Sequence, residues 1–265
     1  MLLANKNAVV YGGGGAIGGA VARAFAQEGA TVYLAGRTRS KLEAVAEAIR
    51  ADGGAAEVAE VDALDEQAVG DHADLMAKAA GSIDIALNAV GIMHVQGTPL
   101  AELSLEDFLH PITAYTRAQF VTAKAVSRHM TRQGSGVILS LSTPGSKLPG
   151  PGFLGFGVTC AAIEATSRLL AGELGGSGVR VVCLRPDAVP QAIAAGSYSR
   201  DVFEPIAARA GVPLDDMLAG AAGNTLLKRL PTLDDVANMA VFLASDRAAA
   251  VTGTVANMTC GSLVD

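Results

Sequence analysis

The chain has 265 residues, of which 50% are hydrophobic and 17% are charged, and its formal net charge is -6. This length and an even spread of apolar residues predict one soluble domain over residues 1–265, without the long apolar run of a membrane span. The acidic balance offers no basic surface for nucleic acid, so neither nucleic acid nor a membrane is an expected partner. The three cysteines lack metal-ligand spacing, which favours a reduced, cytoplasmic protein without a metal site.

Short apolar runs alternate with helical stretches along the whole chain, a pattern typical of strand–helix–strand units. The expected strands are residues 8–11, 31–35, 57–61, 83–88, 137–141, 179–184 and 251–258. The expected helices are residues 17–28, 41–50, 66–79, 105–132, a stretch that follows a loop at 143–152 and ends near Gly175, and 233–244. The predicted fold class is α/β: a Rossmann-type, doubly wound parallel sheet of about seven strands with helices on both faces.

Two segments depart from this regular pattern. Pro111 lacks the backbone donor that a helix interior needs, so two helices are predicted to share residues 105–132, with an interruption near this proline. Between about residues 186 and 226 the periodicity blurs. A stretch of this length inside a compact domain is typical of a lid or of binding loops, and it is the predicted substrate side of the molecule.

A glycine-rich loop, residues 12–18, lies between the first expected strand and the first expected helix. Glycine lets a backbone turn tightly and approach a pyrophosphate, which then lies at the positive end of the helix. The context of a strand before and a helix after the loop predicts a dinucleotide site rather than an ordinary tight turn. The residues of this cradle are Gly12, Gly14, Gly15, Ile17 and Gly18.

With this loop, the chain resembles the short-chain dehydrogenase/reductase family over nearly its whole length. The family's opening motif, Thr-Gly-x-x-x-Gly-x-Gly, corresponds to Tyr11, Gly12, Ala16 and Gly18, so two of its four fixed positions are altered. The family's Asn-Asn-Ala-Gly motif corresponds to residues 88–91, with its second Asn lost. Beyond the loop, the cofactor-binding residues that the resemblance implies are Asp62, Ala63, Asn88, Ala89, Gly91 and Pro186.

The end of the second expected strand indicates which dinucleotide binds. An NAD enzyme of this architecture has an acidic residue there for the ribose 2′-hydroxyl, whereas this chain has Gly36 followed by Arg37. An arginine fork matches a 2′-phosphate, while surface arginines such as Arg37 and Arg39 also occur without a ligand. The missing carboxylate favours NADP(H) as the cofactor.

The catalytic pair of the resembled family has no counterpart here. In that family a tyrosine moves the proton of the substrate oxygen, and a lysine four residues later lowers the pKa of the tyrosine. These positions correspond to Phe156 and Cys160, and no Tyr-x-x-x-Lys occurs elsewhere in the chain. Phe156 has no exchangeable proton, and Cys160 lacks the fixed positive charge of an ammonium group. Ketone reduction by the family mechanism is therefore expected to be crippled.

Other polar side chains remain as candidates. The family's serine position falls on Ser142 or Thr143, which are either catalytic hydroxyls or turn residues at a strand end. Its asparagine position falls on Tyr115, which is either a relocated proton donor or a packed helical tyrosine. His94 is either an acid/base group or a solvated loop residue. Cys160 is either a nucleophile or a small buried residue.

The resemblance implies an NADP(H)-binding oxidoreductase with a non-standard active site that acts on a small molecule. Because the proton donor is lost, a C=N bond or a conjugated C=C bond is the expected substrate group. The alternatives are an inactive nucleotide-binding sensor or partner subunit, and a non-redox lyase or isomerase. Family members assemble through helices that correspond here to residues 118–130 and 156–174, which implies a homodimer or homotetramer.

Overall fold

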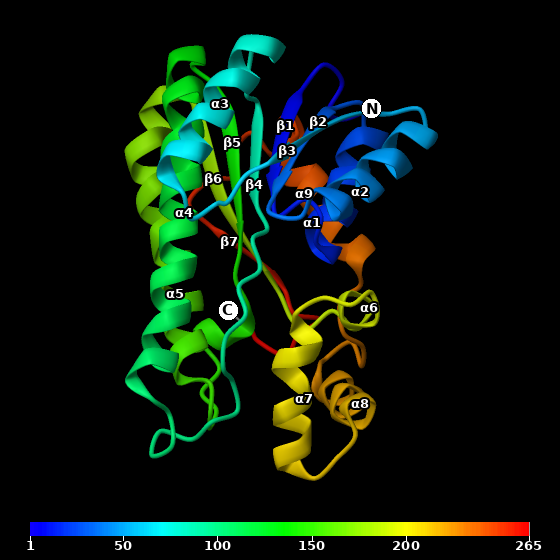
Figure 1. The fold of residues 1–265 in the computed structure, drawn as a ribbon, viewed down its shortest axis with the longest axis vertical. Helices are drawn as coiled ribbons and strands as arrows, with labels where there is room; N and C mark the ends of the chain where they lie inside the picture. Colours follow the sequence, from blue (N-terminus) through cyan, green and yellow to red (C-terminus); the bar gives the residue numbers. More distant parts are fainter. Residues whose placement is uncertain (265) are drawn as a thin grey trace.

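A computed structural model describes residues 1–264 of the chain. Its strands form one seven-stranded parallel sheet in the order β3-β2-β1-β4-β5-β6-β7, which confirms the predicted doubly wound fold (Figure 1). The strands are β1 (Asn7–Tyr11), β2 (Thr31–Gly36), β3 (Ala55–Glu60), β4 (Ile85–Asn88), β5 (Gly136–Leu141), β6 (Val179–Pro186) and β7 (Val255–Met258).

Nine α-helices are present within the described residues. They are α1 (Ala16–Gln27), α2 (Arg39–Ala51), α3 (Glu66–Ala80), α4 (Leu105–Gln133), α5 (Leu154–Leu174), α6 (Pro190–Ala194), α7 (Ser199–Ala210), α8 (Leu214–Asn224) and α9 (Leu233–Ala244). Three short 3-10 turns, Pro144–Ser146, Gly175–Ser177 and Asp246–Ala248, connect some of them.

The sheet is buried on both faces because successive residues of a strand point to opposite sides. In β1, Ala8 and Val10 join the core under α1, α2 and α9, while Val9 and Tyr11 join the core under α3, α4 and α5. Figure 1 shows these two helical layers on either side of the sheet. The apolar runs in the sequence follow from this double burial.

The order of the strands reverses between β1 and β4, since β2 and β3 lie on one side of β1 and the later strands lie on the other. Tyr11, the last residue of β1, pairs with Ala35 of β2 on one side and with Asn88 of β4 on the other. The connections after β1 and β4 therefore diverge from a common edge, and ligands of doubly wound sheets bind at such a point. The glycine loop and residues 88–91 meet there.

The predicted interruption at Pro111 is wrong, because α4 is one helix of 29 residues. Ser104 caps its first turn by accepting from the backbone N–H of Asp107. Pro111 lies in the second turn, so it removes only one hydrogen bond from a long helix. Its ring is buried beside Gly155, and packing against α5 maintains the helix.

The irregular segment predicted at 186–226 is largely helical, which corrects the expectation of loops. It contains α6, α7 and α8, and Figure 1 shows them gathered beyond one end of the sheet. Pro205 inside α7 and the absence of buried residues in α8 explain why the sequence shows no clear helical period. The segment contacts the loop after β4, since Arg209 pairs with Glu102 at 3.0 Å.

One stretch within residues 1–264, Leu154–Ser177, is long and apolar enough to cross a membrane, with a mean hydropathy of 1.2. A core helix of a globular protein meets the same criterion. This stretch contains α5, which packs against α4 and β6. Part of its apolar surface remains exposed, including Val158 and Leu169.

A capping box fixes the start of α9, the helix that packs against α1. The Thr232 hydroxyl accepts from the Asp235 N–H, and the Asp235 carboxylate accepts from the Thr232 N–H. Hydrogen bonds from Arg229 and, to a smaller extent, from Thr232 lower the pKa of Asp235 to about 2. Asp235 is therefore ionised, and accepts both bonds, over the whole physiological range of pH.

We expect Thr232→Ala to destabilise the fold by about 1 kcal/mol, because a helix N–H loses its acceptor. The melting temperature should fall by about 2–4 °C, measured by thermal unfolding. Thr232→Ser retains the hydroxyl and is the matched control. Equal melting temperatures for the alanine and serine variants would show that the cap contributes nothing.

Candidate active site and dinucleotide cradle

The glycine loop forms a tight cradle at the start of α1. Gly12 has a positive φ of 80°, and a Cβ added to it would lie 2.4 Å from the carbonyl oxygen of Ala89. Gly18 packs equally closely, 2.3 Å from the Gly12 oxygen by the same measure. Within residues 1–264, no side chain caps α1, so backbone N–H groups of its first turn remain for an anion. This cradle fits a pyrophosphate.

The predicted residues after β3 and β4 lie beside this cradle at the carboxyl edge of the sheet. The Asp62 carboxylate accepts from the N–H of Leu64, and the neighbouring Ala63 is buried. Asn88 donates to the Thr122 hydroxyl at 2.9 Å and accepts from the Val90 N–H at 3.2 Å. These bonds fix the backbone of residues 88–91 against α4.

Arg37 and Pro186 lie at the carboxyl ends of β2 and β6. Arg37 is exposed, and within residues 1–264 its guanidinium takes part in no ion pair or hydrogen bond. The neighbouring Arg39 differs, because it is paired with Glu43 at 3.2 Å. Pro186 is the buried last residue of β6. Asp187 follows it and accepts hydrogen bonds from Ser262 and from the N–H of Ala188.

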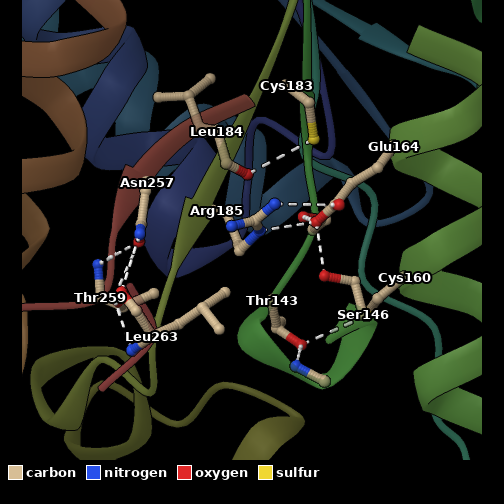
Figure 2. Close-up of polar contacts among 12 residues, drawn as sticks. Thr143, Ser146, Cys160, Glu164, Cys183, Leu184, Arg185, Asn257, Thr259 and Leu263 are labelled. Carbon is tan, nitrogen blue, oxygen red and sulfur yellow. Dashed lines mark hydrogen bonds and ion pairs between the residues drawn. The ribbon is translucent and has the colours of Figure 1, made fainter. Parts of the chain in front are cut away.

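A buried ion pair lies beneath the predicted catalytic positions. Figure 2 shows Arg185 of β6 facing Glu164 of α5, with Ser146 on the same carboxylate. The Arg185 guanidinium donates to the two Glu164 oxygens at 2.8 and 3.1 Å. The hydroxyls of Ser142 and Ser146 each donate to Glu164 Oε1 at 2.7 Å. The Ser142 proton therefore points toward the ion pair.

These contacts decide the charge of Glu164. Burial alone raises the pKa of its carboxyl, but the bonds from Arg185, Ser146 and Ser142 outweigh burial, and the pKa is lowered. Glu164 is therefore an anion at neutral pH. Removing either charge would leave the other buried and unpaired, which is far more costly than the loss of a surface pair.

Cys160 is buried next to Thr143. Its thiol is 0% exposed and lies 3.2 Å from the Thr143 hydroxyl (Figure 2). Burial raises the pKa of this thiol to about 11, so it is protonated at neutral pH. A buried neutral thiol is a poor nucleophile and carries no charge that could replace an ammonium group.

Four aromatic rings from different parts of the chain form a cluster above these residues. His94 stacks on Phe156, with ring centroids 4.1 Å apart and planes 14° apart. Tyr115 and Tyr198 meet His94 edge-on, with centroids at 6.0 and 6.1 Å. Phe156 thus lies among other rings in the candidate site. His94 is only 5% exposed, unlike a solvated loop residue.

The hydroxyl of Tyr115 is bound to the backbone of Ile92. It accepts from the Ile92 N–H at 3.0 Å and donates to the Ile92 carbonyl at 3.1 Å. The hydroxyl also lies 2.9 Å from that of Tyr198, and either phenol can donate in this bond. Burial raises the pKa of both tyrosines, so both remain neutral phenols.

Tyr198 comes from the helical segment and immediately precedes α7. A Cβ added to Gly91 would lie 2.3 Å from the Tyr198 ring, so the ring packs directly on this last residue of the 88–91 motif. Only a glycine allows this approach. A ligand that extends along Gly91 would have to displace the ring of Tyr198.

The structure brings together Thr143, Tyr115, Phe156 and Cys160, while it directs the Ser142 hydroxyl to the ion pair. Sequence reasoning assigned no role in the site to Glu164, Arg185 or Tyr198. A charged residue in the apolar stretch of α5, and another in the apolar run of β6, were signals for the ion pair. No local pattern marks Tyr198, because its partner Tyr115 lies 83 residues away.

Known proteins are similar to this chain over nearly its full length. A family model described as enoyl-(acyl carrier protein) reductase matches residues 14–262. An uncharacterized oxidoreductase of Mycobacterium tuberculosis is 34% identical over 252 residues, covering 95% of this chain and 89% of the relative. D-threitol dehydrogenase of Mycolicibacterium smegmatis is 29% identical over 256 residues, covering 95% and 90%.

The fold is also found among solved structures. The crystal structure of NAD+-bound xylitol dehydrogenase superposes with a TM-score of 0.87 and 24% sequence identity, covering 98% of this chain and 100% of that chain. This likeness supports the assignment of the fold.

We expect Gly12→Ala to abolish dinucleotide binding, because the new methyl group would collide with the Ala89 carbonyl at a positive φ. Fluorescence titration with NADH and with NADPH measures the loss. Gly220→Ala is the control: this exposed glycine of α8 has no atom within 4 Å of an added Cβ. The control should bind normally. Unchanged binding by Gly12→Ala would place the cofactor elsewhere.

Proposed function

The chain belongs to the short-chain dehydrogenase/reductase family, and from this premise we propose that it is an NADP(H)-dependent reductase of C=N or conjugated C=C bonds. Its active site is non-standard, with Phe156 and Cys160 at the positions of the family's tyrosine and lysine. The named relatives are oxidoreductases or dehydrogenases, which favours turnover over a sensor or a lyase.

The preference for NADP(H) rests on Arg37. Its exposed guanidinium lies beyond the end of β2, near the cradle, without a partner among residues 1–264. A free arginine provides a fork for a 2′-phosphate. Neither Gly36 nor Arg37 has a carboxylate, so no negative charge at these positions repels that phosphate. In this proposal the pyrophosphate is held by the residues of the glycine loop, Gly12, Gly14, Gly15, Ile17 and Gly18.

The proposed reaction rests on one observation, which is where the hydroxyl groups of the site direct their protons. The Ser142 proton is given to Glu164, and the hydroxyls of Tyr115 and Tyr198 are engaged with the Ile92 backbone and with each other. Carbonyl reduction in this family needs a positioned proton donor, whose contribution is about 10²- to 10⁴-fold in rate. A substrate that already carries its proton, or takes one from water, avoids this requirement.

The chain's own groups then bind and orient the substrate. When bound, NADPH supplies the hydride. The rings of His94, Phe156 and Tyr198 provide apolar surface for the substrate, and the Thr143 hydroxyl is the remaining candidate for a polar contact. Because both phenols keep a raised pKa, neither serves as the base that alcohol oxidation would require. The site therefore favours reduction.

We extend the proposal to the surroundings of the site. Residues 1–265 act as one domain, in which α6, α7 and α8 form a lid that excludes water.

The exposed apolar side chains Phe120 of α4 and Leu169 of α5 suit a homodimer or homotetramer built on these helices. Free cysteines at 160, 183 and 260 suit the reducing cytoplasm.

Arg37→Gln should weaken NADPH binding about tenfold to a hundredfold, because a charge-assisted contact with the 2′-phosphate is lost. The affinity for NADH should not change. Arg39→Gln is the matched control, since Arg39 is already paired with Glu43. Titration of all three proteins with both nucleotides provides the measurement. An equal loss for both nucleotides would contradict the proposed role.

A substrate panel tests the reaction. The protein is incubated with NADPH and, separately, with simple ketones, conjugated enones and cyclic imines, and NADPH oxidation is followed by absorbance. We expect oxidation with imines or enones and, lacking a general acid, rates about 10²- to 10⁴-fold lower with simple ketones. Turnover of simple ketones alone would refute the proposed substrate group. NADPH binding without any turnover would support the sensor alternative.

A further inference from the structure

The hydrogen bonds of His94 fix its tautomer. Its Nδ1 lies 2.7 Å from the carbonyl oxygen of Ile92, and a carbonyl can only accept. Nδ1 therefore carries the proton, and Nε2 holds a lone pair. This Nε2 is buried and has no hydrogen-bond partner among residues 1–264. A buried acceptor without a partner is costly, which points to a donor from a ligand.

A second buried acceptor lies on the same segment. Residues 92, 94 and 96 are buried while Met93 and Val95 are exposed, so His94 and Gln96 face the same side of the chain. The Oε1 atom of Gln96 is also buried and unpartnered within residues 1–264. The loop after β4 thus directs acceptors inward.

The surroundings of His94 are aromatic rather than acidic. Phe156 covers one face of the imidazole, and Tyr115 and Tyr198 lie at its edges. The titratable groups that face His94 from neighbouring elements are Tyr115 and Tyr198, whose rings contact it, and His110, and none of them is a carboxylic acid. Burial lowers the pKa of His94, so the ring is neutral at neutral pH. Aromatic faces attract cations, and a neutral imidazole does not repel them.

We propose that His94 Nε2 accepts a hydrogen bond from the N–H of a protonated imine, whose positive charge rests against the rings of Phe156 and Tyr198. This inference rests on the proposed reductase function and names its substrate class. A ketone would need a donor from the protein, whereas the unpartnered groups on the loop after β4 within residues 1–264 are acceptors. An iminium ion supplies the missing donor itself.

The reaction balances without a proton from the protein. The iminium carbon accepts hydride from the reduced nicotinamide, which becomes oxidised. The π electrons of the C=N bond become the lone pair of nitrogen, and the N–H bond is kept. The products are a neutral amine and the oxidised cofactor. Neutral acceptors leave the iminium electrophilic, whereas a carboxylate would stabilise the ground-state cation and slow its reduction.

A matched pair of probes tests this binding mode apart from turnover. The 3,4-dihydroisoquinolinium ion carries an N–H, and its N-methyl derivative carries the same charge without a donor. Binding of each probe is measured by calorimetry in the presence of NADP+, which cannot deliver hydride. We expect the wild-type protein to bind the N–H probe about tenfold more tightly or better.

His94→Phe retains a ring on Phe156 but removes the acceptor, so it should bind both probes equally. His110→Phe is the control, because His110 is exposed and bonds only to the Met93 carbonyl among residues 1–264. It should keep the preference for the N–H probe, and thermal unfolding of both variants verifies their folding.

The outcomes separate the two proposals. Equal binding of the two probes by the wild-type protein, or a preference that survives His94→Phe, would overturn the role of His94. Turnover of enones would still support the proposed reductase in that case. If NADPH is oxidised with no member of the substrate panel, the reductase function fails, whatever the probes show. Preferential binding of a neutral alcohol probe would identify His94 as the acceptor for a hydroxyl and also refute the iminium.

Discussion

The buried ion pair between Glu164 and Arg185 is the constraint on which the geometry of the site depends. Charges with so little exposure remain in the interior only if they stay paired and hydrogen-bonded. The pair therefore holds α5 against β6, and the Ser142 and Ser146 hydroxyls attach the loop after β5 to the same carboxylate. Phe156, Cys160 and Glu164 follow one another at intervals of four on α5, so they share one face of the helix.

This arrangement determines where protons can move. The Ser142 hydroxyl donates to Glu164, and the phenols of Tyr115 and Tyr198 bond to the Ile92 backbone and to one another. On the loop after β4, the buried groups left without partners within residues 1–264 are acceptors, His94 Nε2 and Gln96 Oε1. In the proposed function these acceptors bind a substrate that donates, which is the reverse of the requirement for a carbonyl. The glycine cradle thus presents backbone N–H donors and the substrate end presents acceptors, although both lie at the same edge of the sheet.

Much of the fold could be predicted because its signals are local. Apolar runs marked the strands, and the glycine loop between a strand and a helix marked the cradle. The interruption at Pro111 was predicted wrongly because packing against α5 outweighs one lost hydrogen bond. The helices α7 and α8 were missed because Pro205 and a face without buried residues conceal their period. Periodicity predicts a helix only when one face is buried.

The sequence by itself determined the doubly wound sheet and the glycine loop between its first strand and first helix, and it predicted that Phe156 and Cys160 occupy the positions of the family's catalytic pair. These features depend on residue type and on spacing along the chain. Only the tertiary structure decided which groups donate and which accept at the substrate end. The reason is that Ile92, Tyr115, Phe156 and Tyr198 come from four separate segments, and a hydroxyl or an imidazole acquires its direction from the partner that folding places beside it.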